Sequence, residues 1–102
     1  TEGDLGAVRP VTVDFSDIVW HVNSIHSELN LNHFVVKWRV RFYSDGERIE
    51  EVIVGGTAGQ YKASADFPAN AQELVWELDY LMNYGKWITE GSYRVAADGG
   101  EG

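Results

Sequence analysis

The amino-acid sequence predicts an α+β domain, in which a mostly antiparallel β-sheet with a central hairpin at residues 33–54 packs with one helix near 71–84. Three observations carry this prediction. Residues 33–43 alternate between apolar and polar side chains, with the period of a half-buried strand. An Asp-Gly pair of the kind that closes a tight hairpin follows, and residues 71–84 contain an apolar arc with helical spacing. The alternative is an all-β sandwich, because residues 74–80 also alternate as a strand does.

Length and composition predict a single folded domain. The 102 residues are enough to bury one compact core, and a hydrophobic fraction of 44% is too high for a disordered chain. Glycine-rich ends at residues 1–9 and 98–102 are predicted to be arms, either flexible or held by a partner. The absence of cysteine excludes disulfides and thiolate metal sites, and no cofactor is predicted.

The charge of the chain narrows the classes of partner. A net charge of −8 disfavours general binding to nucleic acid or to anionic membranes, because the overall field repels phosphate. No apolar run approaches the ~18 residues of a membrane span. The first ten residues lack the basic and apolar parts of a signal peptide. We therefore expect a soluble protein, without a nucleic-acid or membrane partner.

The first third of the chain is predicted to contain short strands and a long connection. Apolar side chains alternate over residues 11–15 behind Pro10, as in an edge strand. After a break at Ser16-Asp17, residues 18–22 resume the pattern as a second short strand or as the continuation of a bent one. Residues 23–32 contain three asparagines and two serines, which is typical of a connection.

The central strand is predicted to have one buried face and one wet face. Every second residue is apolar, and we expect these side chains to point into the core: Phe34, Val36, Trp38, Val40 and Phe42. The side chains between them are mostly basic and are expected to face water.

The turn at residues 45–46 sets a register that can be checked. It pairs Phe42 with Ile49, but it then brings a glutamate opposite Val40. A β-bulge at Glu50-Glu51 would repair this mismatch, because it keeps both carboxylates outside and returns the following valines to the core.

The second half of the chain begins with a loop and ends with a hairpin. Residues 55–59 form a glycine-rich loop that lacks the spacing of a phosphate-binding loop. A weak strand pattern follows over residues 60–67 and ends at Pro68. Residues 87–97 are predicted to close the chain as two short strands joined at Glu90-Gly91.

Between them, residues 71–84 fit a helix better than a strand. A helix places more of the apolar side chains on one face, and Asn70 and Gly85 supply signals for its two ends. In this helix Trp76, Tyr80 and Tyr84 would form an aromatic stripe away from the aliphatic face. The stripe is either a partner-binding surface or is covered by the rim of the sheet or by the 23–32 connection.

A second candidate partner surface lies on the wet face of the central strand. Lys37, Arg39 and Arg41 are three of only eight cations, and they reverse the sign of the charge locally. They would fit an acidic surface, including that of a second copy. The ordinary alternative is cross-strand pairing with nearby acids, namely Glu47, Glu50 and Glu51.

Catalytic and metal sites are not indicated. His21, His26 and His33 do not have the spacing of a metal-binding sequence, and no serine lies in a nucleophile-elbow sequence. With sixteen acids some close carboxylate pair is expected by chance, so such a pair would say little about catalysis. We therefore expect a protein that is not an enzyme.

Two classes of function remain. The first is a structural or assembly protein that contacts copies of itself or other subunits. The second is a carbohydrate-binding module, in which exposed rings would stack on sugars; the candidates are Trp20, Tyr43, Trp76 and Trp87. An assembly protein should place its aromatic rings against another chain, whereas a sugar module should show two or three coplanar exposed rings in a groove.

One pattern resembles a known group of proteins. The segments IVWHV and FVVKWRV, an Asp-Gly turn, a glycine-rich loop and FPANAQELVWEL together resemble small proteins encoded by tailed phages, in which a WRV-containing hairpin precedes a helix. The resemblance covers residues 18–80. It implies a structural role, for example in a virion, and it assigns no site residues.

Overall fold

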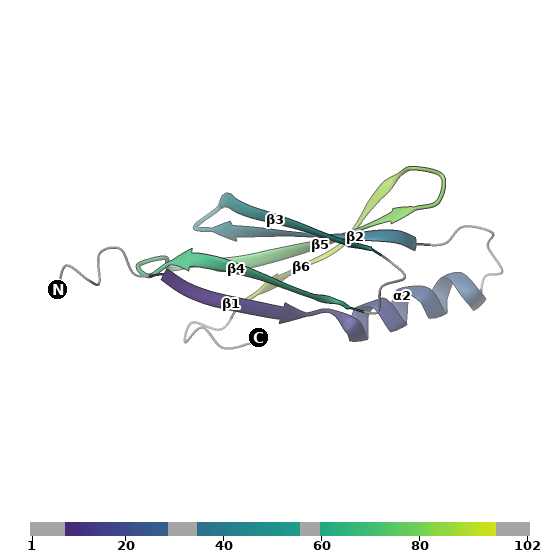
Figure 1. Ribbon diagram of the computed structural model, residues 1–102, viewed down its shortest axis with the longest axis horizontal. Helices are drawn as coiled ribbons and strands as arrows, with labels where there is room; N and C mark the ends of the chain where they lie inside the picture. The colour runs from purple at the N-terminus through teal and green to yellow at the C-terminus, as the bar shows by residue number, and fades with distance from the viewer. Residues whose placement is uncertain (1–7, 29–34, 56–59, 96–102) are drawn as a thin grey trace.

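The computed structural model describes residues 8–28, 35–55 and 60–95 (Figure 1). The elements follow in the order β1 (Val8–Asp14), α2 (Ser16–Glu28), β2 (Val35–Ser44), β3 (Glu47–Gly55), β4 (Lys62–Pro68), β5 (Leu74–Met82) and β6 (Trp87–Arg94). Mostly antiparallel sheet with one helix in the described part of the chain agrees with the predicted fold class. The predicted position of the helix is wrong.

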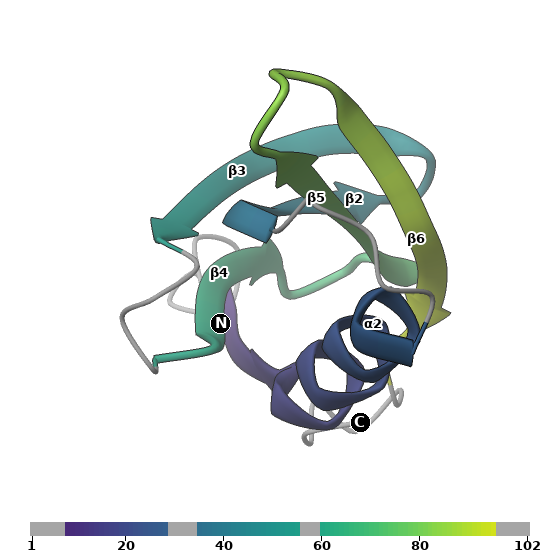
Figure 2. The same cartoon turned by 90° about the vertical axis from the view of Figure 1, so that its right-hand side faces the viewer.

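The strands form two antiparallel sheets with one core between them. The larger sheet has the order β3-β2-β5-β6, and the smaller one pairs β1 with β4. The β1–β4 pair and α2 lie on one side of the larger sheet, as the end-on view shows (Figure 2). The opposite side, which we call the outer face, is covered by no described element.

Residues 71–84 contain the strand β5 instead of the predicted helix. Their pairing with β2 explains this, since the two strands match at the centre of their register: Val40 lies opposite Leu78, Phe42 opposite Trp76, and Arg39 opposite Asp79. Each apolar side chain meets an apolar one on the inner face, and a cation meets an acid on the outer face. Gly85 has the predicted positive φ of 86°, but it lies in the turn between β5 and β6.

The helix of this protein is α2, where the sequence predicted a strand at 18–22 and a connection at 23–32. Val19 and Val22 are buried while Trp20 is exposed, which is helical spacing and not alternation. The helix begins where the Asp14 carboxylate accepts a hydrogen bond from the Ser16 N–H at 2.9 Å. Residues 29–32 of the predicted connection lie outside the described residues.

The central hairpin is confirmed, with a small error in its register. Asp45 and Gly46 have φ values of 50° and 87°, as a type I′ turn requires. The bulge lies next to Phe42, which pairs with Glu50 and not with Ile49, so the predicted bulge at Glu50-Glu51 is one residue too far from the turn. Ile49 is instead half-buried against the core, while both glutamates stay exposed as predicted.

The inward face of β2 is confirmed at its centre and wrong at its start. Trp38, Val40 and Phe42 are all buried. An irregularity in the pairing with β5 near Val36 turns that side chain outward and buries Val35 instead. The predicted Phe34 lies outside the described residues.

The ends of the chain differ from the predictions in two places. β1 is confirmed as an edge strand, but it starts at Val8, inside the predicted arm of residues 1–9. β6 is one strand, and Glu90-Gly91 forms a bulge in it rather than a hairpin turn. The remaining residues of both predicted arms lie outside the described part of the chain.

Candidate functional site

The predicted basic stripe on β2 is part of an ion-pair cluster on the outer face. Asp79 of β5 lies beneath the stripe with a side chain that is 0% exposed. Its Oδ2 accepts a hydrogen bond from Arg39 Nε at 2.8 Å, and its Oδ1 accepts one from Arg41 Nη2 at 3.0 Å. Arg41 Nε also lies 2.8 Å from Oδ2, but it is not directed for a hydrogen bond. We call this group, with Glu77 and Tyr43, the arginine cluster.

The arginine cluster spans β2 and β5 and reaches β6. Arg41 Nη2 lies 2.7 Å from Glu77 Oε1, and the Tyr43 hydroxyl donates to the same oxygen at 3.3 Å. Arg39 lies over the ring of Trp87 on β6, with its Cζ 4.2 Å from the ring centroid. Burial opposes the charge of Arg41, but the hydrogen bond and charge of Asp79 outweigh it and raise the pKa of this guanidinium.

The expectation of cross-strand pairing is therefore right in kind but wrong in its partners. Arg39 and Arg41 bind acids of β5, not Glu47, Glu50 or Glu51. Glu51 pairs with Arg48 on its own strand at 3.3 Å. Lys37 is exposed and forms no ion pair with any described residue.

The predicted aromatic stripe does not exist, because residues 76–82 are a strand. Trp76 is 7% exposed and stacks on Tyr93 inside the core, with ring centroids 4.6 Å apart. Tyr80 packs on Trp38 at 5.5 Å on the same inner face. Only Tyr84, in the turn after β5, is largely exposed. The stripe therefore offers no common surface to a partner.

The rings predicted to stack on sugars are also not brought together. Trp76 is in the core, while Tyr43 and Trp87 lie half-buried in and beside the arginine cluster. Trp20 alone is fully available, with 77% of its surface exposed on α2.

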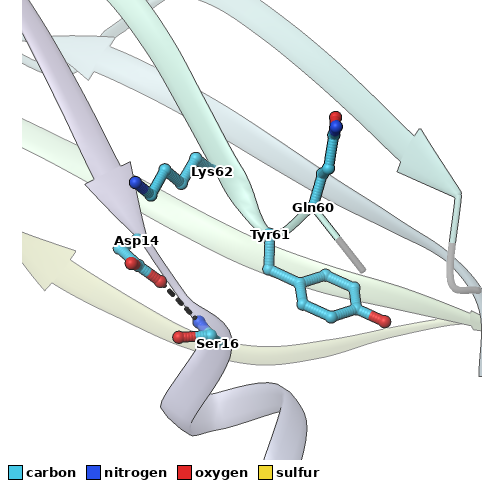
Figure 3. Close-up of a pocket in the computed structure, with 5 residues that line it drawn as sticks. All are labelled: Asp14, Ser16, Gln60, Tyr61 and Lys62. Atoms are coloured by element: carbon cyan, nitrogen blue, oxygen red, sulfur yellow. Dashed lines mark hydrogen bonds between the residues drawn. The ribbon is translucent and has the colours of Figure 1, made fainter. Parts of the chain in front are cut away.

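A groove lies beside Trp20, where α2 meets the start of β4. One recess has a volume of about 520 Å³ and is lined by Asp14, Ser16, Gln60, Tyr61 and Lys62 (Figure 3). A second recess of about 270 Å³ shares Ser16 and Tyr61 with the first and adds Val19, Trp20 and Asn23. Sequence analysis identified only Trp20 among the residues of this groove, because the groove is formed by two segments, 14–23 and 60–62, that lie far apart in the chain.

The wall of the groove is fixed by the core. The Tyr61 ring lies 5.9 Å from Phe15 and 6.3 Å from Trp38, and the Tyr61 carbonyl accepts the Phe15 N–H at 2.9 Å. Asp14 is held by Ser16, whose N–H and hydroxyl lower the pKa of the carboxyl, so it is ionised at neutral pH. Lys62 extends toward Asp14 in Figure 3 and favours the same ionised form.

No metal-binding cluster is present among the described side chains, which include His21 but neither His26 nor His33. Likewise, no helix in the described ranges is long and apolar enough to cross a membrane. Comparison of the chain with protein-family models, curated proteins and solved structures gives no significant match.

Proposed function

We propose that this protein is a non-enzymatic assembly subunit, which binds a second copy of itself through the outer face of its larger sheet. The observation that carries the proposal is the composition of that face. A solvated face of an antiparallel sheet normally presents polar side chains. Here the arginine cluster is bordered by apolar side chains, among them Ile53, which is 49% exposed.

The side chains of the outer face are those that protein interfaces favour. Arg39, Arg41, Tyr43 and Trp87 belong to the residue types that are enriched in interfaces, whereas Lys and Glu are depleted there. All four are held by mutual contacts. Little side-chain entropy would therefore be lost when a partner covers them.

The charges at the centre of the face are already paired. Covering an isolated ion is costly, but the Asp79 carboxylate is neutralised by two guanidinium groups before any partner arrives. A partner can thus cover the arginine cluster without leaving an unpaired charge.

The charge distribution favours a second copy in a head-to-tail arrangement. Among the described residues, the register and the ion pair between Arg94 and Glu73 place five of the eight cations and four acids on the outer face. This gives the face a formal charge of +1 on a chain of −8: Lys37, Arg39, Arg41, Arg48 and Arg94 against Glu51, Glu73, Glu77 and Asp79. The exposed side of the smaller sheet carries Asp14 and Asp66 against Lys62, which leaves it one net negative charge. Contact between these unlike faces is heterologous, so it can build rings or longer assemblies. A virion is one setting for such a subunit, in line with the phage resemblance.

The test is the mass of the protein in solution. Light scattering after size exclusion should show oligomers at low ionic strength that dissociate in about 1 M salt, because salt at that concentration screens charges beyond about 3 Å. Lys37→Glu should weaken association, since it reverses an exposed charge that forms no ion pair with any described residue.

Lys86→Glu is the matched control, because it reverses an exposed charge in the turn between β5 and β6, outside both faces of the proposed contact. It should leave association intact. A protein that stays monomeric at every concentration and salt level, or a Lys37→Glu variant that assembles like the wild type, would contradict the proposal.

A further inference from the structure

We infer that the groove between α2 and the start of β4 binds a neutral carbohydrate, with the Trp20 indole as the platform on which a sugar ring stacks. The groove lies between α2 and β4, on the side of the molecule away from the outer face (Figure 2). Of its lining residues, only Asp14 and Lys62 also belong to the exposed side of the smaller sheet that the proposed contact would cover.

Trp20 offers an exposed ring in a fixed position. It lies on a helix whose neighbouring residues Val19 and Val22 are in the core, so its position is fixed while its ring faces solvent. A flat apolar surface with an aromatic quadrupole suits the C–H face of a sugar ring.

The groove beside Trp20 is large enough for a ligand. Its two recesses of about 520 and 270 Å³ meet at Ser16 and Tyr61, and together they have a size within the range of small-molecule sites. Tyr61 is anchored by Phe15 and Trp38, so the groove exists before a ligand arrives. A preformed site loses little entropy on binding.

Polar side chains line both recesses of the groove. The Asn23 and Gln60 side-chain amides can each donate and accept hydrogen bonds, Asp14 accepts and Lys62 donates. Sugar hydroxyls are both donors and acceptors and need such a mixed set. A protein-docking patch would instead show several exposed apolar side chains around the tryptophan, whereas Ile25 is the one other large apolar side chain exposed among the described side chains of α2.

The charge of the groove selects a neutral ligand. Asp14 and Lys62 give it one negative and one positive charge, which leave no net attraction for an ion. The N-terminus of α2 could attract an anion, but the Asp14 carboxylate already accepts the Ser16 N–H there. Phosphorylated and carboxylated ligands are therefore disfavoured.

The experiment measures binding of the full chain to four neutral oligosaccharides, the tetrasaccharides of glucose, mannose, xylose and N-acetylglucosamine. Calorimetry should detect binding of at least one of the four oligosaccharides. Iodide quenching should show that the ligand protects an exposed tryptophan, since Trp38 and Trp76 are already buried. Trp20→Ala should weaken binding at least about tenfold, as expected for a ring that supplies the central contact.

Ile53→Ala is the matched control, because it also removes an exposed apolar side chain but lies on the outer face. It should bind the sugar like the wild type. The inference fails if none of the four sugars binds, if Trp20→Ala binds as well as the wild type, or if Trp20→Ala instead abolishes self-association. Because association is tested through Lys37, either proposal can fail while the other holds.

Discussion

Asp79 shows how one residue can fix the arrangement of a sheet. Its carboxylate is fully buried, and such a charge is tolerated only when partners neutralise it. Arg39 and Arg41 do so from the neighbouring strand. Moving β5 by one residue along β2 would turn Asp79 into the apolar core and would also turn Leu78 outward. The ion pairs therefore select the register that the apolar pattern also selects.

Replacing Asp79 should be among the most damaging single changes in the protein. Asp79→Ala leaves two half-buried guanidinium groups without their acid, and we expect it to lower the free energy of unfolding by about 3–5 kcal/mol. Urea denaturation followed by tryptophan fluorescence measures this loss. Glu51→Ala is the control, because it breaks only the exposed pair with Arg48 and should cost less than about 1 kcal/mol. Equal losses in the two variants would contradict this view of the arginine cluster.

Tyr93 is a second residue whose surroundings have a measurable effect. Burial of the ring, and then the hydrogen bond that the hydroxyl donates to Glu90, raise the pKa of Tyr93 from 10.0 to about 12. Gly91 makes this position possible, since a Cβ there would lie 2.8 Å from the Tyr93 hydroxyl oxygen. The phenol is therefore held in its protonated form more strongly in the folded chain than in the unfolded one.

This pKa predicts the pH dependence of stability. A raised folded-state pKa contributes stability that is complete below pH 10 and is lost as the pH rises from 10 toward 12. The difference in unfolding free energy between the wild type and Tyr93→Phe should thus shrink with pH across that interval. Glu90→Gln should lower the Tyr93 pKa, which tyrosine absorbance at alkaline pH would show. A difference that stays constant up to pH 12 would contradict the assignment.

At the scale of the elements, Asp45 joins the central hairpin to the link between β4 and β5. The Asp45 carboxylate accepts the N–H groups of Gln72 and Glu73 at 3.0 and 2.8 Å, and its own N–H donates to the Glu73 carbonyl at 2.8 Å. The turn residue of one hairpin therefore satisfies the backbone where the next strand begins. The backbone amides of Gln72 and Glu73 lie at the start of the helix that sequence analysis predicted at residues 71–84.

Substitutions at Asp45 can separate its two roles, which are the positive φ in the turn and the acceptance of the Gln72 and Glu73 N–H groups. Asp45→Gly keeps the positive φ but removes the acceptor, and Asp45→Asn keeps the positive φ and one neutral acceptor. We expect a loss of about 1–3 kcal/mol for Asp45→Gly and a smaller loss for Asp45→Asn, because each charge-assisted hydrogen bond is worth more than a neutral one. Thermal unfolding of the wild type and of the two variants measures these losses of stability. If the two variants are as stable as the wild type, the contact has no structural role.

The elements also show how far the sequence predicts the fold. The central hairpin was predictable because Asp45-Gly46 and the alternation in β2 are local signals. The secondary structure of residues 74–82 and 16–28 was not predictable in this way. Each segment carries apolar side chains both at the strand period of two residues and at the helix period of 3.6 residues. Long-range pairing decides between the periods: β5 is a strand because β2 offers it a matching row of cations and apolar residues. The charge complementarity of Arg39 and Asp79 was the signal that could have shown this.

The candidate sites follow the same division between local and long-range information. The basic stripe was visible in β2, but its true acids lie about forty residues further along the chain. Trp20 was identified as a candidate, yet the groove needs Tyr61 and Lys62 beside it. Only the pairing of β1 with β4, which puts Asp14 opposite Lys62, brings these residues together.

At the scale of the whole molecule, the two sheets depend on one shared core. A two-stranded sheet is not stable alone, so β1 and β4 need the larger sheet beneath them. The contact is made by rings: Phe67 of β4 meets Phe42 of β2 at 5.8 Å, and Phe15 meets Trp38 at 6.0 Å. Neither sheet has a separate core that could persist when the other unfolds.

This dependence predicts that the protein unfolds in one step. Phe67→Ala, which removes a fully buried ring from the smaller sheet, should cost about 3–5 kcal/mol. Because the larger sheet loses its support at the same moment, the midpoints from far-ultraviolet circular dichroism and from the fluorescence of Trp38 and Trp76 should shift together. If fluorescence kept its wild-type midpoint while the dichroism signal moved, β1 and β4 would be a separate unit. Agreement of both probes would instead show that the large sheet, and the outer face it presents, exist only with the smaller sheet in place.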